Sequence, residues 1–251
     1  MADDHRRGKA TPNRSAATPT TAITENRLLA TLPEGVLTAL QRHMHPVQLE
    51  WKEVLFRAHE PLATVYFPTS AVISFVAHLE SGETLEVGLV GRDGLVGTSV
   101  FPGISTMSCD GMVQVPGWAF RMGADELRRQ LLANQSLYSA IGRYAQVLLV
   151  RSMQMSVCNT FHSVEQRCVR WLLMVNDLLY HDDIALTHDL IATMLGVHRP
   201  TVTLVLRSLH KSGLIDEARG HVRLRDRAGL EAACCECYGM MRAEQRRLLS
   251  Y

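Results

Sequence analysis

Apolar residues between Leu186 and Leu224 recur at intervals of three and four, first before Gly196 and again after it. This spacing puts them on one face of an α-helix, so the stretch predicts two short amphipathic helices. Gly196 can adopt a positive φ without a Cβ clash, and the small Ala192 allows the helices to cross closely. The layout is typical of a helix-turn-helix. The two apolar stripes are Leu190, Ile191, Met194 and Leu195, then Val202, Val205, Leu206 and Leu209.

The second helix of this motif begins at His198-Arg199-Pro200-Thr201. A proline fits there because the first turn of a helix leaves its N–H groups unpaired. Helix-turn-helix proteins place this end of the helix against base edges in the major groove. Arg199 is the best candidate reader, because a guanidinium can donate two hydrogen bonds to guanine. The predicted DNA-binding residues are Thr187, His188, His198, Arg199, Thr201, Thr203, Arg207, Lys211, Arg219 and His221, against the alternative of an ordinary charged helical surface.

A short hairpin with a basic tip is predicted after the second helix. Ser212-Gly213 ends the helix, and two short apolar runs, 214–215 and 222–224, flank a turn that contains Arg219 and His221. These two side chains would lie over phosphate or in the minor groove, as in the wing of a winged helix-turn-helix. Residues 228–249 then predict a further helical stretch, with Arg242, Arg246 and Arg247 on a solvated face.

Short β-rich runs fill the chain between Val47 and Met122, separated by turn signals such as Ser81-Gly82 and Pro102-Gly103. Many short strands at this spacing predict an antiparallel roll or sandwich. Before them, residues 26–43 predict a helix in two pieces divided by Pro33. The predicted strands are Val47–Leu49, Val54–Phe56, Thr64–Phe67, Val72–Val76, Leu85–Val90, Met112–Val115 and Trp118–Met122.

A single long helix is predicted at residues 134–159, with apolar residues at intervals of three and four. A second, smaller stripe runs beside the first: Tyr138, Ala145, Leu149, Ser152 and Ser156. The wide apolar face suits a helix buried on two sides, either inside one chain or between two chains. The first stripe, which could face the chain's own β-roll or a partner helix, consists of Leu137, Ile141, Tyr144, Leu148 and Met155. Ser163 and Gln166 then form a predicted capping box for the next helix.

Charge is distributed unevenly along a chain whose net charge is +1. Residues 184–227 hold seven lysines and arginines against four acids, whereas residues 24–110 hold five against ten. The basic character is therefore concentrated at the predicted motif. No apolar run is long enough for a membrane helix and no signal peptide is visible, so we expect a cytoplasmic protein without a membrane partner.

The six cysteines lack the regular spacing of a disulfide scaffold, which fits a reducing compartment. Cys234, Cys235 and Cys237 are the densest group and could bind a soft metal, but no complementary Cys/His pair is spaced like a zinc site. We interpret them as structural and predict no metal and no cofactor. No Ser/His/Asp grouping, phosphate loop or paired-carboxylate pattern stands out, so the sequence does not predict an enzyme.

The motif from Leu186 to Leu224, the wing and the tail from Asp226 to Tyr238 resemble the Crp/Fnr family of bacterial transcription regulators. The resemblance covers roughly Arg27 to Tyr238. It implies an α+β protein with an N-terminal antiparallel β-roll of the cyclic-nucleotide-binding type, a double-stranded jelly roll. It further implies that the long helix is a dimerisation helix, with its first apolar stripe (Leu137, Ile141, Tyr144, Leu148 and Met155) as the interface, and that a C-terminal winged helix-turn-helix follows it. The implied partners are double-stranded DNA, a second copy of the chain and, for an activator, RNA polymerase.

The chain departs from the family pattern at two sites. In the recognition helix, Pro200 replaces a glutamate and Leu204 stands where a second arginine often lies. In the roll, nucleotide-binding members hold the ribose with a Gly-Glu pair and the phosphate with an arginine. Here the matching positions lack both groups, and Asp110 would repel a phosphate, so we predict no response to cyclic AMP. The candidate effector pocket is Gly94, Leu95, Gly97, Cys109 and Asp110.

The predicted organisation is therefore a disordered tail at residues 1–22, a β-roll effector domain at 23–133, a dimerisation helix at 134–160 and a winged helix-turn-helix at 161–251. The predicted function is a dimeric, sequence-specific DNA-binding transcription regulator. The alternative is a redox, thiol or haem-type sensor that uses the roll, with Cys109 or His78 as the reactive group and DNA binding as the output.

Overall fold

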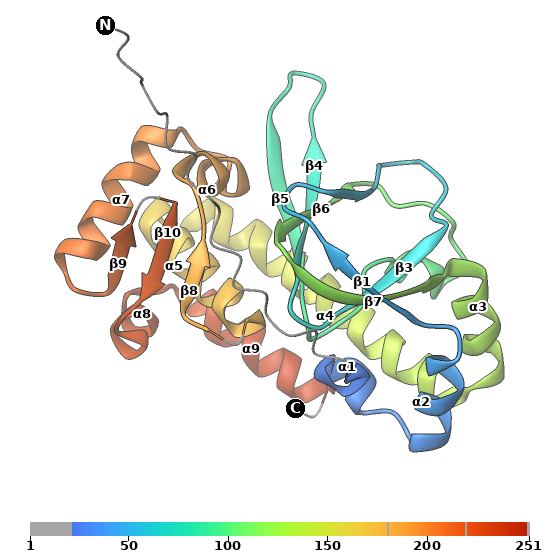
Figure 1. The fold of residues 1–251 in the computed structure, drawn as a ribbon. Helices are drawn as coiled ribbons and strands as arrows, with labels where there is room; N and C mark the ends of the chain where they lie inside the picture. The colour runs from blue at the N-terminus through green and yellow to red at the C-terminus, as the bar shows by residue number, and fades with distance from the viewer. Residues whose placement is uncertain (1–21, 180, 219, 250–251) are drawn as a thin grey trace, which may run out of the picture.

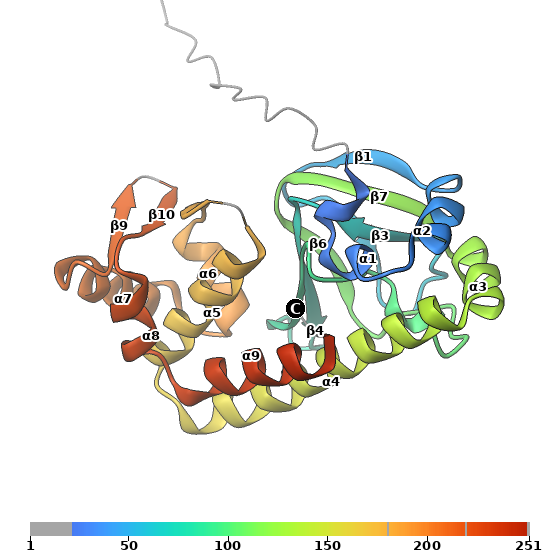
Figure 2. The same cartoon turned by 90° about the horizontal axis from the view of Figure 1, so that it is seen from below.

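The computed structural model describes residues 22–179, 181–218 and 220–249. A long helix, α4 (Gln135–Phe161), runs beneath two bodies (Figures 1 and 2). A β-roll lies over its N-terminal half, and a cluster of helices with a small sheet lies over its C-terminal end. Of the tail predicted at residues 1–22, all but Ala22 lies outside the described residues. No helix in the described part is long and apolar enough to span a bilayer.

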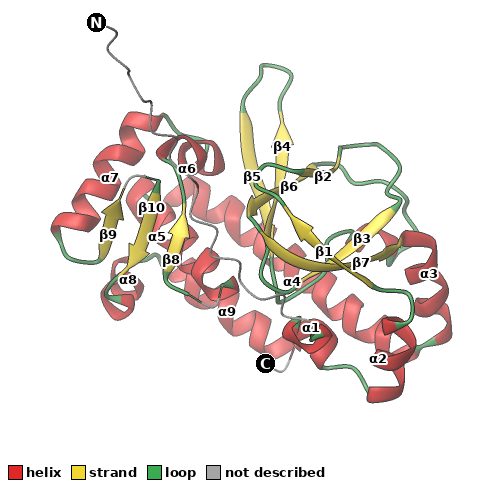
Figure 3. Ribbon diagram, in the orientation of Figure 1, coloured by secondary structure: helices red, strands yellow, loops and turns green. Residues whose placement is uncertain are grey.

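The roll is built from seven strands in two antiparallel sheets, coloured yellow in Figure 3. They are β1 (His45–Leu49), β2 (Val54–Phe56), β3 (Thr64–Pro68), β4 (Val72–His78), β5 (Thr84–Val90), β6 (Asp110–Val115) and β7 (Gly117–Gly123). One sheet has the order β1-β7-β3 and the other has the order β2-β6-β4-β5. Each of the seven predicted apolar runs is a strand, in the predicted order, and the α+β fold class is confirmed.

Short helices accompany the strands of the roll: η1 (Ile23–Glu25), α1 (Arg27–Ala30), α2 (Glu34–Gln41), η2 (Thr98–Val100) and α3 (Ala124–Ala133). Pro33 divides α1 from α2 as predicted. The buried Asn26 caps α1, and its side-chain amide donates to the carbonyl oxygens of Pro68 and Gly94, both at 2.8 Å. One amide thus joins the N-terminal helices to the roll, because it satisfies backbone groups far away in the sequence.

Strand β4 is buried on both faces, which explains why its sequence is an almost unbroken apolar run. Successive side chains of a strand point to opposite faces. Ile73 packs in the core of the roll, whereas Val72 and Val76 pack in a second core with Trp171 and Leu172 of α5 (Val164–Leu178). The roll and the C-terminal body therefore share a hydrophobic core.

The inner face of α4 is occupied by its own chain. Leu137, Ile141, Tyr144 and Met155 are buried there, and Leu148 is half-buried. Leu137, Ile141, Tyr144 and Met155 are therefore not available to a partner, because a helix with two apolar stripes presents one of them to its own chain. A contact of Leu148 with a partner stays a prediction. The exposed apolar residues of α4 form an outer stripe: Tyr138, Leu149, Met153, Val157 and Phe161. Only Tyr138 and Leu149 belong to the second stripe predicted from the sequence, whose other members are Ala145, Ser152 and Ser156.

The C-terminal body contains α5, β8 (Asp183–Ala185), α6 (His188–Leu195), α7 (Arg199–Lys211), β9 (Ile215–Ala218), β10 (His221–Leu224), α8 (Arg227–Ala233) and α9 (Glu236–Leu249). The predicted capping box is present, since Ser163 Oγ accepts from Gln166 N and the Gln166 side chain accepts from Ser163 N. The small sheet has the order β8-β10-β9.

The predicted helical stretch at residues 228–249 is broken. Helix α8 ends at Cys234, whose backbone is extended, and α9 starts at Glu236 and returns along α4 (Figure 2). The face of α9 expected to be solvated is only partly so. Arg242 stacks over Tyr238 and pairs with Glu231 at 3.3 Å, because α8 and α9 bring these residues together.

Candidate nucleic-acid interface

Helices α6 and α7 form the predicted helix-turn-helix. Thr187 caps α6 by accepting from Leu190 N at 3.2 Å, and Gly196 ends it in the left-handed region at φ 62°. A residue with a Cβ rarely adopts that conformation, so glycine sets the turn. His198 is the N-cap of α7, and Pro200 lies in its first turn. The predicted stripe of α7 is buried: Val202, Val205, Leu206 and Leu209.

The outer face of α7 is open to solvent. Arg199, Leu204 and Arg207 are exposed, and together with Pro200 and Thr203 they line a shallow depression. Leu204 is 68% exposed, which places an unpaired apolar side chain in the middle of a basic face. His198 and Lys211 are exposed at the two ends of the helix, and Thr201 is half-buried. This face is 13 residues long, enough to follow a major groove.

His188 joins three elements of the motif. Its Nδ1 lies 2.9 Å from Thr203 Oγ1 on α7, and its Nε2 lies 2.7 Å from Glu217 Oε1 on β9. The imidazole therefore fixes the wing relative to the second helix. The sequence suggested that His188 and Thr203 contact DNA, whereas the structure shows both polar groups engaged within the chain.

The wing is the hairpin of β9 and β10, with His221 opposite Ala218. Val222 is buried and anchors the hairpin, while His221 is exposed and lies 3.4 Å from Asp183. Arg219, predicted at the tip, lies outside the described residues. Asp183 also approaches Arg223 at 3.8 Å, so acidic neighbours offset part of the basic charge of the wing.

The only ion pair found for Arg199 in the described chain is with Asp189 of α6, at 3.4 Å. Both side chains are more than 60% exposed, at 64% and 68%. Such a surface pair is weak in water, so a phosphate or a base can take the place of Asp189. The arrangement holds the guanidinium at the entrance of α7 and leaves it available to a ligand.

Comparison with known proteins supports the assignment of α6, α7 and the wing to a helix-turn-helix domain. The profile of the Crp-like helix-turn-helix domain matches residues 166–233, the segment that contains α6, α7 and the wing. Residues 166–233 therefore form a Crp-like helix-turn-helix domain. No curated protein matches the sequence.

Solved structures match most of the chain. FixK2 from Bradyrhizobium japonicum is 15% identical with a TM-score of 0.67, covering 76% of this chain and 98% of that one. CLP from Xanthomonas campestris, a c-di-GMP-responsive global regulator, is 20% identical with a TM-score of 0.60, covering 77% and 100%. A CRP-family regulator from Thermus thermophilus is 19% identical with a TM-score of 0.62, covering 74% and 95%. At these identities the likeness establishes the fold.

Two glycines of the candidate effector loop lie close to side chains of other elements of the roll and of α4. A Cβ added to Gly94 would lie 1.8 Å from Tyr144 Cζ, and one added to Gly97 would lie 2.9 Å from Val65 Cγ1. Leu95 is fully buried. Side chains of the protein itself therefore pack directly against this loop at Gly94 and Gly97.

Cys109 and Asp110, at the start of β6, face a different environment. Burial raises the pKa of the Cys109 thiol to about 11. Asp110 accepts from the backbone N–H of Ala58 at 2.8 Å and lies 3.2 Å from His78 Nε2. His78 is thus positioned against a carboxylate, and Asp110 fixes the loop before β3.

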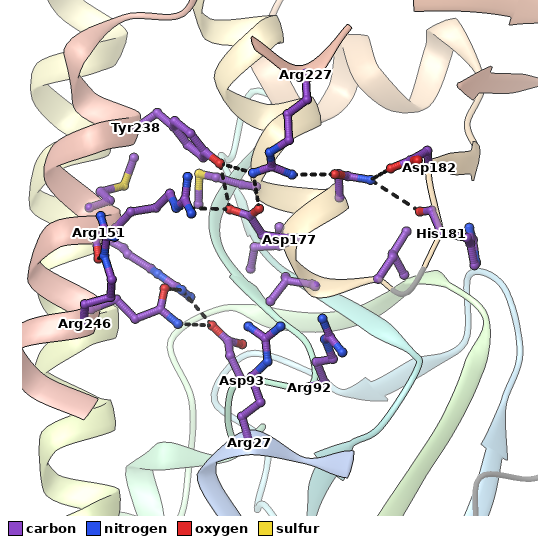
Figure 4. A pocket seen from close by; sticks show the side chains of 18 residues that line it. Arg27, Arg92, Asp93, Arg151, Asp177, His181, Asp182, Arg227, Tyr238 and Arg246 are labelled. Carbon is purple, nitrogen blue, oxygen red and sulfur yellow. Dashed lines mark hydrogen bonds and ion pairs between the residues drawn. The ribbon is translucent and has the colours of Figure 1, made fainter. Parts of the chain in front are cut away.

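A cavity of about 390 Å³ lies where the roll meets α5, α8 and α9 (Figure 4). Asp93 and Arg151 pair across it at 2.6 Å, and Gln245 of α9 contacts both. Asp177 accepts from Arg227 at 2.5 Å and from Tyr238 at 2.9 Å. Six arginines and three aspartates line the cavity, which gives it a net positive charge.

Sequence reasoning did not find this network. Its two main ion pairs, Asp93 with Arg151 and Asp177 with Arg227, join residues that are 58 and 50 positions apart. One signal was present: Arg151 falls in the inner apolar stripe of α4, four residues before Met155. A charged residue on a buried face requires a buried partner.

The junction between roll and winged domain contains one more buried carboxyl group. Glu86 of β5 accepts from Trp171 Nε1 of α5 at 3.0 Å and from Ser74 Oγ at 2.6 Å. Burial raises the pKa of Glu86 to about 7, and these hydrogen bonds oppose the rise. The contact ties the winged domain to the β4–β5 hairpin.

Proposed function

We propose that this chain is a homodimeric, sequence-specific, DNA-binding transcription regulator of the Crp/Fnr type, with α7 as its recognition helix. The observation that carries the proposal is the open outer face of α7, which presents Arg199 and Arg207 beside an exposed Leu204. In the major groove, the methyl group of a thymine offers this exposed leucine an apolar contact, beside the bases that the two arginines can reach.

Each exposed side chain has a distinct proposed role. Arg199 reads a guanine through two hydrogen bonds, and Leu204 contacts a thymine methyl. Arg207, Lys211, His198 and His221 contact phosphates, which adds affinity without sequence preference. The hydroxyl groups of Thr187 and Thr201 donate hydrogen bonds to the sugar-phosphate backbone of the DNA. His188 and Thr203 position the wing and α7 relative to one another.

We infer that two chains pair through the outer stripe of α4. Leu149, Met153 and Val157 are exposed on successive turns of α4, and a partner helix would bury them. A two-fold axis along α4 would present two α7 helices to half-sites about 34 Å apart. RNA polymerase is the expected further partner if the protein is an activator.

The roll supports a regulator that does not respond to cyclic AMP. A nucleotide phosphate needs a cation, and Asp110 brings a negative charge to the matching position. The alternative of a thiol sensor in the roll is disfavoured, because the raised pKa keeps Cys109 protonated and unreactive near neutral pH.

The test is selection of bound duplexes from a random pool, followed by affinity measurements with Arg199→Ala. We expect a single enriched motif, and a loss of about 1–3 kcal/mol on that motif with relaxed choice at one base pair. Arg247→Ala is the matched control, since Arg247 is an exposed arginine of α9 that pairs only with Glu244 in the described chain.

Two outcomes would contradict the proposal. Absence of any enriched motif would exclude sequence-specific recognition. Equal loss on the motif and on random duplex would show that Arg199 contacts phosphate alone.

A further inference from the structure

Four metal-ligating side chains meet where α4 ends and α9 begins. They are Cys158, His162, Cys235 and Cys237, and their ligand atoms all lie within 4.8 Å of one another. The three cysteines are fully or almost fully buried, and the histidine side chain is 13% exposed. The group is separate from the DNA-facing surface and from the cavity of Figure 4.

The backbone explains why these residues converge. Cys158 and His162 are four residues apart at the end of α4, so they share one face of the helix. Cys235 and Cys237 lie on either side of the first residue of α9. Packing of α9 along α4 then joins the two pairs, which are 73 or more residues apart in the sequence.

The distances fit a tetrahedral ion. Cys158 Sγ lies 3.6 Å from Cys235 Sγ, and Cys237 Sγ lies 3.5 Å from His162 Nδ1. Zinc with bonds of about 2.3 Å to sulfur and about 2.0–2.1 Å to nitrogen separates its ligands by roughly 3.5–3.8 Å. Three cysteines and one histidine are a common ligand set for structural zinc.

The residues around the group orient its ligands as in known metal sites. His162 Nε2 lies 3.1 Å from Glu236 Oε2, so the imidazole donates on that side and turns the Nδ1 lone pair toward the cysteines. Gln154 Nε2 donates to Cys237 Sγ at 3.1 Å. Carboxylate–histidine pairs of this kind fix the tautomer of a metal ligand.

A buried cation next to the group provides the complementary charge. Arg170 is 2% exposed, contacts Met174 Sδ at 3.2 Å, and interacts electrostatically with Cys158. Its Nε has no hydrogen-bond partner, and the buried carboxyl group of Glu86 also interacts with it electrostatically. Three thiolates and one Zn²⁺ carry a net charge of −1, which would compensate the buried guanidinium.

We propose that Cys158, His162, Cys235 and Cys237 bind a structural zinc ion that clamps α9 to the end of α4. Three thiolates select a soft or borderline cation over Mg²⁺ or Ca²⁺. His162 is followed within two residues by α5, so the ion lies at the joint between the long helix and the winged domain. Binding releases the thiol protons to solvent and forms three Zn–S bonds and one Zn–N bond, with no redox change.

The first experiment measures metal in the untagged full chain. The protein is purified under reducing conditions, reconstituted with Zn²⁺ and dialysed, and its metal content is determined by mass spectrometry. We expect about one zinc ion per chain, and thiolate-to-cobalt absorption bands typical of tetrahedral sites after replacement by Co²⁺. A zinc content near zero without such bands overturns the proposal, as does a stable Cys158–Cys235 disulfide in place of the ion.

Variants locate the ion. Cys158→Ser and Cys235→Ser should lose zinc and the cobalt bands. Cys234→Ser, one residue away but outside the group, and Cys109→Ser, in the roll, should keep both. Retention of zinc by Cys158→Ser and Cys235→Ser would place the ion elsewhere and overturn the assignment.

A milder variant avoids dependence on folding. Glu236→Gln weakens only the support of His162 and should lower zinc affinity by about 10–100-fold in competition with a chelator. Glu244→Gln is the control, because Glu244 lies on the same helix but pairs with Arg247. This variant should leave the zinc affinity unchanged. If the two variants bind zinc with equal affinity, Glu236 does not support His162 as a ligand, which contradicts the proposed geometry. These readouts are independent of DNA binding.

Discussion

The winged domain and the β-roll differ in how their candidate residues are used. In the winged domain, Arg199, Leu204 and Arg207 extend into solvent from one helix. In the roll, the loop expected to hold an effector is packed by its own chain, with Tyr144 against Gly94 and Val65 against Gly97. One region keeps an open surface, and the candidate loop of the other is packed by side chains of its own chain.

The difference reflects what each kind of site requires. A DNA-reading surface needs a few exposed side chains on a single helix, and helical periodicity determines which residues those are. A pocket needs empty space enclosed by several elements, and the side chains that fill it come from distant parts of the chain. Tyr144 of α4 lies 50 residues after Gly94, so no local pattern connects them.

The largest expected effect comes from a substitution in α4, the long helix that contacts both regions. Leu149→Glu places a charge at a 49% exposed position of α4, which a single chain tolerates but which a dimer would bury. We expect dissociation by analytical ultracentrifugation and a loss of about 100- to 10,000-fold in affinity for a two-half-site operator.

Leu132→Glu is the matched control for this variant, because Leu132 is 85% exposed on α3, away from the stripe. If both variants sediment as dimers, the pairing surface lies elsewhere and the proposed placement of two recognition helices is wrong.

The second prediction concerns the pH dependence of stability that arises from Glu86, which joins the β-roll to Trp171 of the winged domain. Because burial raises the pKa of Glu86 from 4.5 to about 7, the folded chain binds this proton more tightly than the unfolded chain. The associated stability is fully present below about pH 4.5 and is lost as the pH rises through about 7, on the order of 3 kcal/mol in total.

Glu86→Gln removes the titrating group and keeps an oxygen for Trp171. Urea unfolding at about pH 5 and about pH 8 should therefore show a smaller fall in free energy for this variant than for the wild type. Glu83→Gln, an exposed position on the same hairpin, should behave like the wild type. An unchanged pH dependence in Glu86→Gln would mean that Glu86 ionises normally and that water reaches the junction.

The smallest expected effect comes from a substitution in the candidate effector loop, where Gly94 packs against Tyr144. Gly94→Ala drives a methyl group into the ring of Tyr144 and should lower the free energy of unfolding by about 1–3 kcal/mol. Gly35→Ala is the control, since nothing lies within 4 Å of an added Cβ in α2. Thermal unfolding compares the two. A Gly94→Ala protein as stable as the wild type would show that the loop has spare room, and the contrast between the two regions would weaken.

Local sequence patterns were sufficient for most of the architecture. Periods of two and of three to four located all seven strands of the roll, the long helix and the helix-turn-helix, because these patterns state directly which side of an element is buried. Residues with special backbone roles marked the boundaries: Pro33, Ser163, Thr187 and Gly196. The reading face of α7 followed from the same periodicity.

Only the tertiary structure decided which apolar stripe of α4 meets the roll, that α9 returns along α4, and that Asp93 pairs with Arg151. The same packing joins Cys158 and His162 to Cys235 and Cys237, a group whose two halves show no zinc-like spacing in the sequence. The physical reason is that periodicity fixes the orientation of a side chain about its own element. Which element lies opposite depends on how the whole chain closes its core, and that information is not local.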